Sequence, residues 1–192
     1  MVTNPRRERD RSQREQLIVT AAREIAEQEG WDAVTTRRLA AKIEYSQPVL
    51  YGHFSGKGAI MAAAALEGCT EMAAQLRKGA GTAEDSRGAL RRLAENYFDF
   101  ADREPALYDA IFTLASELDF ASPDSPEPLK DAFGALLEIV GPVAGDYDPG
   151  LFTETFWAAL HGLITLERGR RLPADARTER IGMLVDRFAV GG

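Results

Sequence analysis

Few side chains in this sequence of 192 residues are suited to covalent chemistry. The sequence holds two histidines, His53 and His161, and a single cysteine, Cys69. Neither histidine has a nucleophile or an acidic partner at a useful spacing, so no nucleophile–base pair is predicted. One cysteine can form neither an internal disulfide nor a Cys-x-x-Cys metal site. The sequence therefore argues against an enzyme, and we expect neither a metal nor a cofactor.

One short segment instead carries side chains suited to binding. Residues 46–57 read SQPVLYGHFSGK and bring an amide, a phenol, an imidazole and an ammonium group together within a few helical turns. Ser46 can cap a helix in which Pro48 lies in the first turn, where a proline is tolerated. If Leu50 and Phe54, four residues apart, are the buried positions, the opposite side of this helix is exposed.

The elements that would position this segment are all predicted to be helices, because no sustained period-two alternation is present. A capping box of Ser12 and Glu15 precedes a first helix over about residues 17–29, and short helices follow over about 36–43 and 47–54. Such an arrangement fits a helix-turn-helix unit. Six further helices are expected near residues 57–78, 90–104, 106–118, 128–140, 151–170 and 174–190, which gives an all-α fold of about nine helices.

In a helix-turn-helix unit the third helix enters the major groove of DNA. Gln47 can then make a bidentate contact to adenine, and Pro48 can press on a thymine methyl group. Tyr51 and His53 can reach phosphates. Lys57, at the start of the next helix, suits a phosphate, and Arg37 suits a phosphate or a guanine.

The sequence resembles the TetR family of transcriptional regulators in TTRRLA, from Thr35, and in SQPVLYGHFSGK. The family pattern Leu-Tyr-x-His-Phe-x-x-Lys is met by Leu50 to Lys57. The resemblance implies a homodimer on a palindromic operator in double-stranded DNA, together with an unknown small-molecule effector. It implies DNA contacts from Thr35, Thr36, Arg37, Ser46, Gln47, Pro48, Val49, Tyr51, Gly52, His53 and Lys57. Glu44 stands where the family usually has glycine in the turn, and its carboxylate would repel phosphates.

The charge distribution agrees with DNA binding near the N-terminus. The formal net charge is −7, but residues 1–57 hold ten Lys and Arg against eight Asp and Glu. An arginine-rich arm over residues 1–11 is either solvated or contacts phosphates or the minor groove. No segment predicts a signal peptide or a membrane span, so we expect a cytoplasmic protein with no membrane partner.

The second half resembles a type of TetR regulatory domain with a Trp-x-x-x-His-Gly pattern, which Trp157, His161 and Gly162 meet. We expect candidate ligand contacts at Tyr97, Phe112, Phe133, Trp157 and His161. The alternative is that most of these residues belong to the hydrophobic core, as aromatic residues at helical spacing usually do. Cys69 is expected to be a buried small hydrophobe. The apolar helix near residues 151–170 and the stripe on the last helix predict a dimer interface with Leu160, Leu163, Ile181, Leu184 and Phe188.

Together these patterns predict a flexible basic arm over 1–11, a helix-turn-helix domain over 12–60 with its motif at about 35–54, and a regulatory and dimerisation domain over 61–192. The expected function is a ligand-responsive repressor. The alternative is a helical small-molecule-binding protein with weakened or lost DNA binding, which Glu44 would favour.

Overall fold

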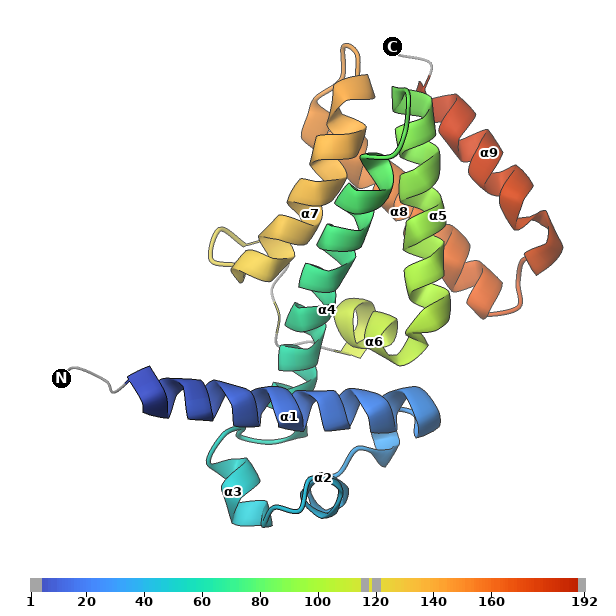
Figure 1. The fold of residues 1–192 in the computed structure, drawn as a ribbon. Coiled ribbons are helices and arrows are strands. Elements are labelled where there is room, and N and C mark those ends of the chain that lie inside the picture. Colours follow the sequence, from blue (N-terminus) through green and yellow to red (C-terminus); the bar gives the residue numbers. More distant parts are fainter. Residues whose placement is uncertain (1–4, 115–117, 119–121, 190–192) are drawn as a thin grey trace. The chain divides into compact units, whose positions relative to one another are not determined.

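The computed structural model describes residues 5–114, 118 and 122–189, and all regular structure in these residues is helical (Figure 1). The chain forms two compact units. The first unit is Met1–Gly68 with Glu104–Pro126, and the second is Cys69–Arg103 with Glu127–Gly192. The first unit thus contains a segment near residue 110 that the sequence assigned to the regulatory domain. Within the described residues, no helix is both long enough and apolar enough to cross a membrane.

Helix α1 (Pro5–Glu29) begins well before Ser12, where the sequence predicted its start. The predicted flexible arm is therefore helical from residue 5, and its residues 1–4 lie outside the described part. The extension fits local chemistry, because a proline is tolerated in a first helical turn. The Arg11 and Glu15 side chains, four residues apart, are joined at 2.8 Å. Gly30, with a φ of 82°, ends the helix.

Helices α2 (Thr36–Lys42) and α3 (Gln47–Tyr51) follow the short 3₁₀ turn η1 (Trp31–Ala33). Thr35 caps α2 by accepting the Arg38 backbone N–H at 3.2 Å. The turn after α2 places Glu44 at a φ of 58°, the left-handed conformation for which a glycine is usual at this position. Helix α3 is shorter than the predicted 47–54: it ends at Tyr51, and a tight turn follows in which the Phe54 N–H donates to the Leu50 carbonyl at 2.9 Å.

The rest of the first unit comes from the start of α4 (Lys57–Ala80), from α6 (Pro105–Asp109) and from a π-helical stretch, η2 (Ala110–Leu114). Gly68 allows α6 to lie close to α4. A Cβ atom added at Gly68 would lie 2.9 Å from Leu107 Cγ, which is too close for a side chain. The predicted helix over 106–118 includes residues 115–117, which lie outside the described part, as do residues 119–121 of the next predicted loop.

The second unit contains the end of α4, α5 (Ser86–Arg103), α7 (Glu127–Val140), α8 (Pro149–Arg168) and α9 (Arg177–Phe188), with the 3₁₀ turns η3 (Gly141–Val143) and η4 (Ala174–Ala176). Helix α5 contacts α7, α8 and α9, and Tyr97 and Phe100 on α5 are fully buried together with Phe156 on α8. Burial also raises the pKa of the Cys69 thiol to about 12, which makes this cysteine unreactive. The predicted all-α fold is confirmed, although Val190 of the last predicted helix lies outside the described residues.

Candidate nucleic-acid interface

The short helix α3 is held by one buried side chain and exposes the rest of its surface. Leu50 is 1% exposed, whereas Val49 is 41% and Tyr51 is 55% exposed. Gln47 and Pro48, at the start of the helix, are exposed as well. The burial of one side chain stabilises such a short helix only slightly. The other side chains of α3 are exposed, so its outer surface is available to another molecule.

Helix α2 contributes the neighbouring part of the same surface. Thr35 and Arg37 are exposed, and Thr36 is half-buried. The hydroxyl oxygens of Thr36 and Tyr51 lie 3.5 Å apart, which joins α2 to α3. Ser46 and Gly52, the residues flanking α3, are also exposed. The structure thus brings together the DNA-contact candidates on α2 and α3.

His53 is the exception among these candidates. Its ring nitrogen Nδ1 lies 3.3 Å from Glu15 Oε1 on α1, and its side chain is only 10% exposed. Burial raises the pKa of Glu15, but hydrogen bonds from Arg11 and His53 outweigh it and bring this pKa below its ordinary value. The interpretation that His53 reaches a phosphate stays a prediction; in this structure its ring faces Glu15 and joins the end of α3 to α1.

Lys57 lies at the first residue of α4, as predicted, and keeps a partly exposed ammonium group. Its Nζ atom is 3.7 Å from Asp32 Oδ1, and the lysine side chain is 39% exposed. A long pair between exposed groups contributes little to stability, so the ammonium group can exchange Asp32 for another anion at small cost. Lys57 therefore remains a phosphate-binding candidate.

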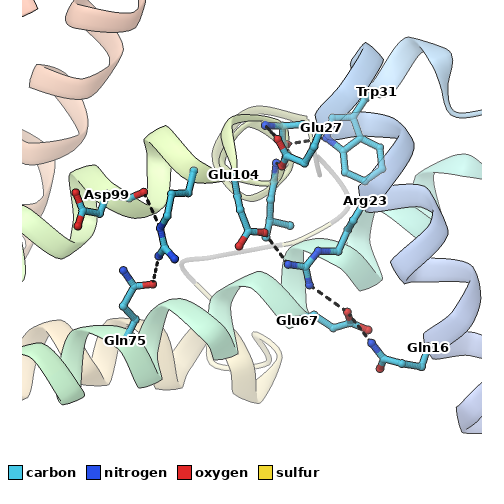
Figure 2. Close-up of polar contacts among 11 residues, drawn as sticks. Gln16, Arg23, Glu27, Trp31, Glu67, Gln75, Asp99 and Glu104 are labelled. Atoms are coloured by element: carbon cyan, nitrogen blue, oxygen red, sulfur yellow. Dashed lines mark hydrogen bonds and ion pairs between the residues drawn. The ribbon is translucent and has the colours of Figure 1, made fainter.

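A set of polar contacts within the first unit joins α1 to α6, and the sequence did not predict it (Figure 2). The Glu27 carboxylate accepts the backbone N–H groups of Ala106 at 3.1 Å and Leu107 at 2.8 Å. Trp31 donates its indole N–H to the Ala106 carbonyl at 2.7 Å. Arg23 pairs with Glu104 at 2.7 Å. We call these contacts the α1–α6 clamp, and no local pattern signals it because its partners lie far apart in the sequence.

The aromatic candidates for a ligand site divide between the two units. In the second unit, Trp157 donates its indole N–H to the Tyr97 hydroxyl at 2.7 Å, and the rings of Phe133 and Trp157 lie 6.5 Å apart. Burial, with a smaller contribution from the charge of Arg168, lowers the pKa of His161 on the same helix. Phe112 belongs to the first unit and packs against Tyr108, with ring centres 4.7 Å apart. The five predicted residues therefore do not form a single cluster within either unit.

The dimer candidates also divide into two groups. Leu163, Leu184 and Phe188 line a groove between α8 and α9. Leu160 and Ile181 are 0% and 5% exposed, so they belong to the core of the single chain and are not surface residues. The reason is helical geometry: one side of the mostly apolar helix α8 packs into its own unit, and Leu160 lies on that side.

The geometry of the first unit defines a class of protein. Three helices, a tight turn and a short third helix whose outer surface is exposed form a helix-turn-helix protein. The chain belongs to the TetR family: residues 90–188, more than half of the chain, match the model of the tetracyclin repressor-like C-terminal domain, and residues 18–64 match that of the bacterial regulatory proteins of the tetR family.

Individual relatives agree with this assignment. The chain is 38% identical over 96 residues to the uncharacterized HTH-type transcriptional regulator YobS of Bacillus subtilis, an alignment that covers 50% of each chain. It is 27% identical over 152 residues to an uncharacterized HTH-type transcriptional regulator of Mycobacterium tuberculosis, covering 78% of this chain and 68% of the relative. The chain thus spans about half the length of the first of these relatives.

Solved structures share the fold. A protein of unknown function from Rhodococcus sp. RHA1 has a TM-score of 0.76 at 22% identity, covering 92% of this chain and 94% of that one. The fatty acid degradation regulator FadR from Bacillus halodurans has a TM-score of 0.67 at 15% identity, covering 100% of this chain and 98% of the other. At such low identity the likeness concerns the fold alone.

Proposed function

We propose that this protein is a dimeric repressor that a small molecule releases from a palindromic operator. The observation that carries the proposal is the exposed surface of α2 and α3, where Gln47, Pro48 and Tyr51 are exposed while Leu50 is buried. Amide and phenol groups on a helix of this kind match the donor and acceptor pattern of the major groove. The family to which the chain belongs supports the same interpretation.

Dimerisation would supply the second recognition helix. Two copies of α3 set about 34–36 Å apart would enter successive major grooves on one side of the duplex. The α8–α9 groove is the surface we assign to the partner subunit, because it is apolar along Leu163, Leu166 and Leu184. Arg180, which lines the same groove, is paired with Glu167 at 3.1 Å, so covering the groove leaves this charge compensated.

The effector would bind in the second unit. Tyr97, Phe133 and Trp157 provide an aromatic cluster there, with His161 one helical turn beyond Trp157. The lowered pKa of His161 keeps its imidazole neutral near neutral pH, which suits a ligand that is apolar or uncharged at this end. A thermal-shift screen of metabolites and drugs would identify the effector, because a ligand of the folded state raises the melting temperature.

The α1–α6 clamp offers a route from the effector to the DNA-binding helices. Helix α6 directly follows α5 in the chain, since Arg103 ends α5 and Pro105 begins α6. Glu27, Trp31 and Arg23 fasten this start of α6 to α1. A ligand that displaces the end of α5 would therefore move α6, and the clamp would pass the displacement to α1.

The direct test is a gel shift with the DNA upstream of the protein's own gene. Gln47→Ala should cost about 1–3 kcal/mol at one base pair of each half-site and relax the preference there. Lys57→Ala should weaken binding to all sequences equally and flatten the log–log salt dependence by about 0.9 for each phosphate that is no longer neutralised. If both variants bind as the wild type does, residues 47–57 do not read DNA. If the wild type binds no upstream fragment, the alternative of a ligand-binding protein without DNA binding gains support.

A further inference from the structure

The N-terminal half of α1 extends beyond the folded core of the first unit and is rich in arginine. Residues 5–14 are all exposed, and the first buried residue of α1 is Ile18. Five arginines lie between residues 5 and 17. A helix that is exposed on all sides needs a reason to persist, and local ion pairs such as Arg11–Glu15 supply only a few tenths of a kcal/mol, about 0.2–0.5.

The arginines are not scattered evenly around this helix. Arg14, Arg11 and Arg7 precede Ile18 by four, seven and eleven residues, the spacing that keeps side chains on one side of an α-helix. The side of α1 that packs into the first unit therefore continues toward the N-terminus as a line of three arginines, which we call the arginine stripe. Arg9 precedes Ile18 by nine residues, or about two and a half turns, and lies on the opposite side.

The first unit leaves part of this charge unneutralised. Its other basic residues near the DNA-binding helices are mostly paired, as Arg38 is with Glu29 and Lys42 with Glu24. Arg7, Arg14 and Arg37, in contrast, have no side-chain hydrogen bond or ion pair with the described residues 5–114, 118 and 122–189. Two of these three arginines belong to the stripe, and the third lies on α2 within the candidate DNA surface.

The stripe starts beside the end of α3. His53, two residues after α3, contacts Glu15 on α1 at 3.3 Å, and α1 runs on from this point toward the N-terminus past α3 (Figure 1). At about 1.5 Å per residue, Arg7 lies roughly 12 Å along the axis from Glu15. The major groove is also about 12 Å wide. The segment of α1 from Glu15 to Arg7 is therefore long enough to extend from α3 in the groove to the phosphates that border it.

We propose that the arginine stripe is a second DNA-contact element, in which Arg7 and Arg14 bind backbone phosphates that flank the sequence contacted by α3. The inference rests on the proposed function, because it adds contacts to the same complex. It assigns the stripe to affinity and not to sequence preference, since phosphate contacts carry no base information. Arg11 shares its charge with Glu15 and contributes less.

The test compares two double variants that remove the same charge from different sides of α1. Arg7→Gln with Arg14→Gln removes the unpaired part of the stripe, and Arg6→Gln with Arg9→Gln is the matched control. Glutamine is a good helix former, so circular dichroism should show the same helix content in both variants. Binding is measured between 50 and 200 mM salt on an upstream duplex and on the same duplex trimmed by several base pairs at each end.

We expect the stripe variant to bind the full duplex with a log–log salt slope flatter by about 0.9 for each phosphate that it no longer neutralises, whereas the control keeps nearly the wild-type slope. On the trimmed duplex, the wild type and the stripe variant should bind with nearly the same affinity and salt slope. Equal slopes for the two double variants, with wild-type binding intact, would overturn the stripe and leave the proposed function standing. A wild-type protein that binds no DNA would overturn both.

Discussion

One surface of each unit combines exposed apolar side chains with nearby arginines, and these two surfaces differ in whether the arginines are paired. In the first unit, Val49 and Tyr51 on α3 are exposed beside Arg37, which has no partner in the described part of the chain. In the second unit, Leu166 and Met183 are exposed in the α8–α9 groove.

Three arginines near that groove are paired within the chain, whereas Arg187 in its lining has no side-chain hydrogen bond or ion pair with the described residues. Glu167, whose side chain is 7% exposed, pairs with both Arg177 and Arg180. Arg87 pairs with Asp186 near the end of α9. Apolar groups beside unpaired cations suit a polyanion, which supplies the missing charge. Apolar groups beside paired charges suit another protein surface, because burying them leaves no uncompensated ion.

The largest effect is expected from placing unpaired charge in the groove. Leu163→Glu with Leu184→Glu should give a monomer, because a carboxylate buried at an apolar interface without a partner is expensive. Two half-sites bound by one dimer gain affinity through effective concentration, so a monomer should bind the operator about 10²–10⁴-fold more weakly. Light scattering reports the mass, and a gel shift reports the affinity.

The control for that experiment adds the same charge outside the groove. Ser86→Glu with Thr178→Glu changes two exposed residues that are not part of its lining. This variant should remain dimeric and bind the operator as the wild type does. A wild-type protein that is already monomeric at micromolar concentration would contradict the assignment of the α8–α9 groove to a dimer interface.

A smaller effect is expected from cutting the clamp through which the second unit would act on the first. Glu27→Ala removes the acceptor of two backbone N–H groups at the start of α6, and this change should cost about 1–3 kcal/mol of unfolding free energy. Denaturant unfolding measures the cost. Once an effector is known, the variant should also show a smaller ratio between operator affinity without and with that effector, because α6 is no longer fastened to α1.

Glu24→Ala is the matched control for Glu27→Ala, because Glu24 lies one turn away on α1 and forms a surface ion pair with Lys42 at 2.9 Å. Exposed pairs contribute at most about 1 kcal/mol, and this one does not involve α6. The control should therefore keep the wild-type effector response. Equal effector responses from the two variants would mean that the clamp stabilises the first unit but does not couple effector binding to DNA binding.

Structural features that depend on residues close together in the sequence could be predicted, whereas contacts between residues far apart in the sequence could not. The place of Pro48 in the first turn of the third helix and the buried position of Leu50 follow from local spacing, and both appear in the structure. The pair of His53 with Glu15 joins residues 38 positions apart, and the Glu27 contact with Leu107 spans 80. Their partners are fixed only by tertiary packing, so the contact of His53 with α1 could not be predicted from its neighbours in the sequence.

The smallest predicted changes in stability and DNA affinity concern two strained turns, one in each unit. Glu44 and Arg170 are the non-glycine residues with positive φ, at 58° and 54°, among the described residues. Each follows a helix in the same type of turn, closed by Tyr45 N–H to Ala40 O at 2.9 Å and by Arg171 N–H to Leu166 O at 2.8 Å. Replacing either by glycine removes a steric cost of roughly 1–2 kcal/mol. Glycine's greater freedom in the unfolded chain costs about 0.5–1 kcal/mol of stability, which offsets part of this gain.

Both glycine variants should thus be more stable by about 0.5–1 kcal/mol. Only Glu44→Gly should also bind DNA more tightly, by about twofold at low salt, since it removes a carboxylate beside α3. Glu44→Gln separates the two causes, because it removes the charge and keeps the strained backbone. It should tighten DNA binding without the gain in stability, whereas Arg170→Gly should give the gain alone. Tighter DNA binding by Arg170→Gly would show that turn strain, and not local charge, limits affinity.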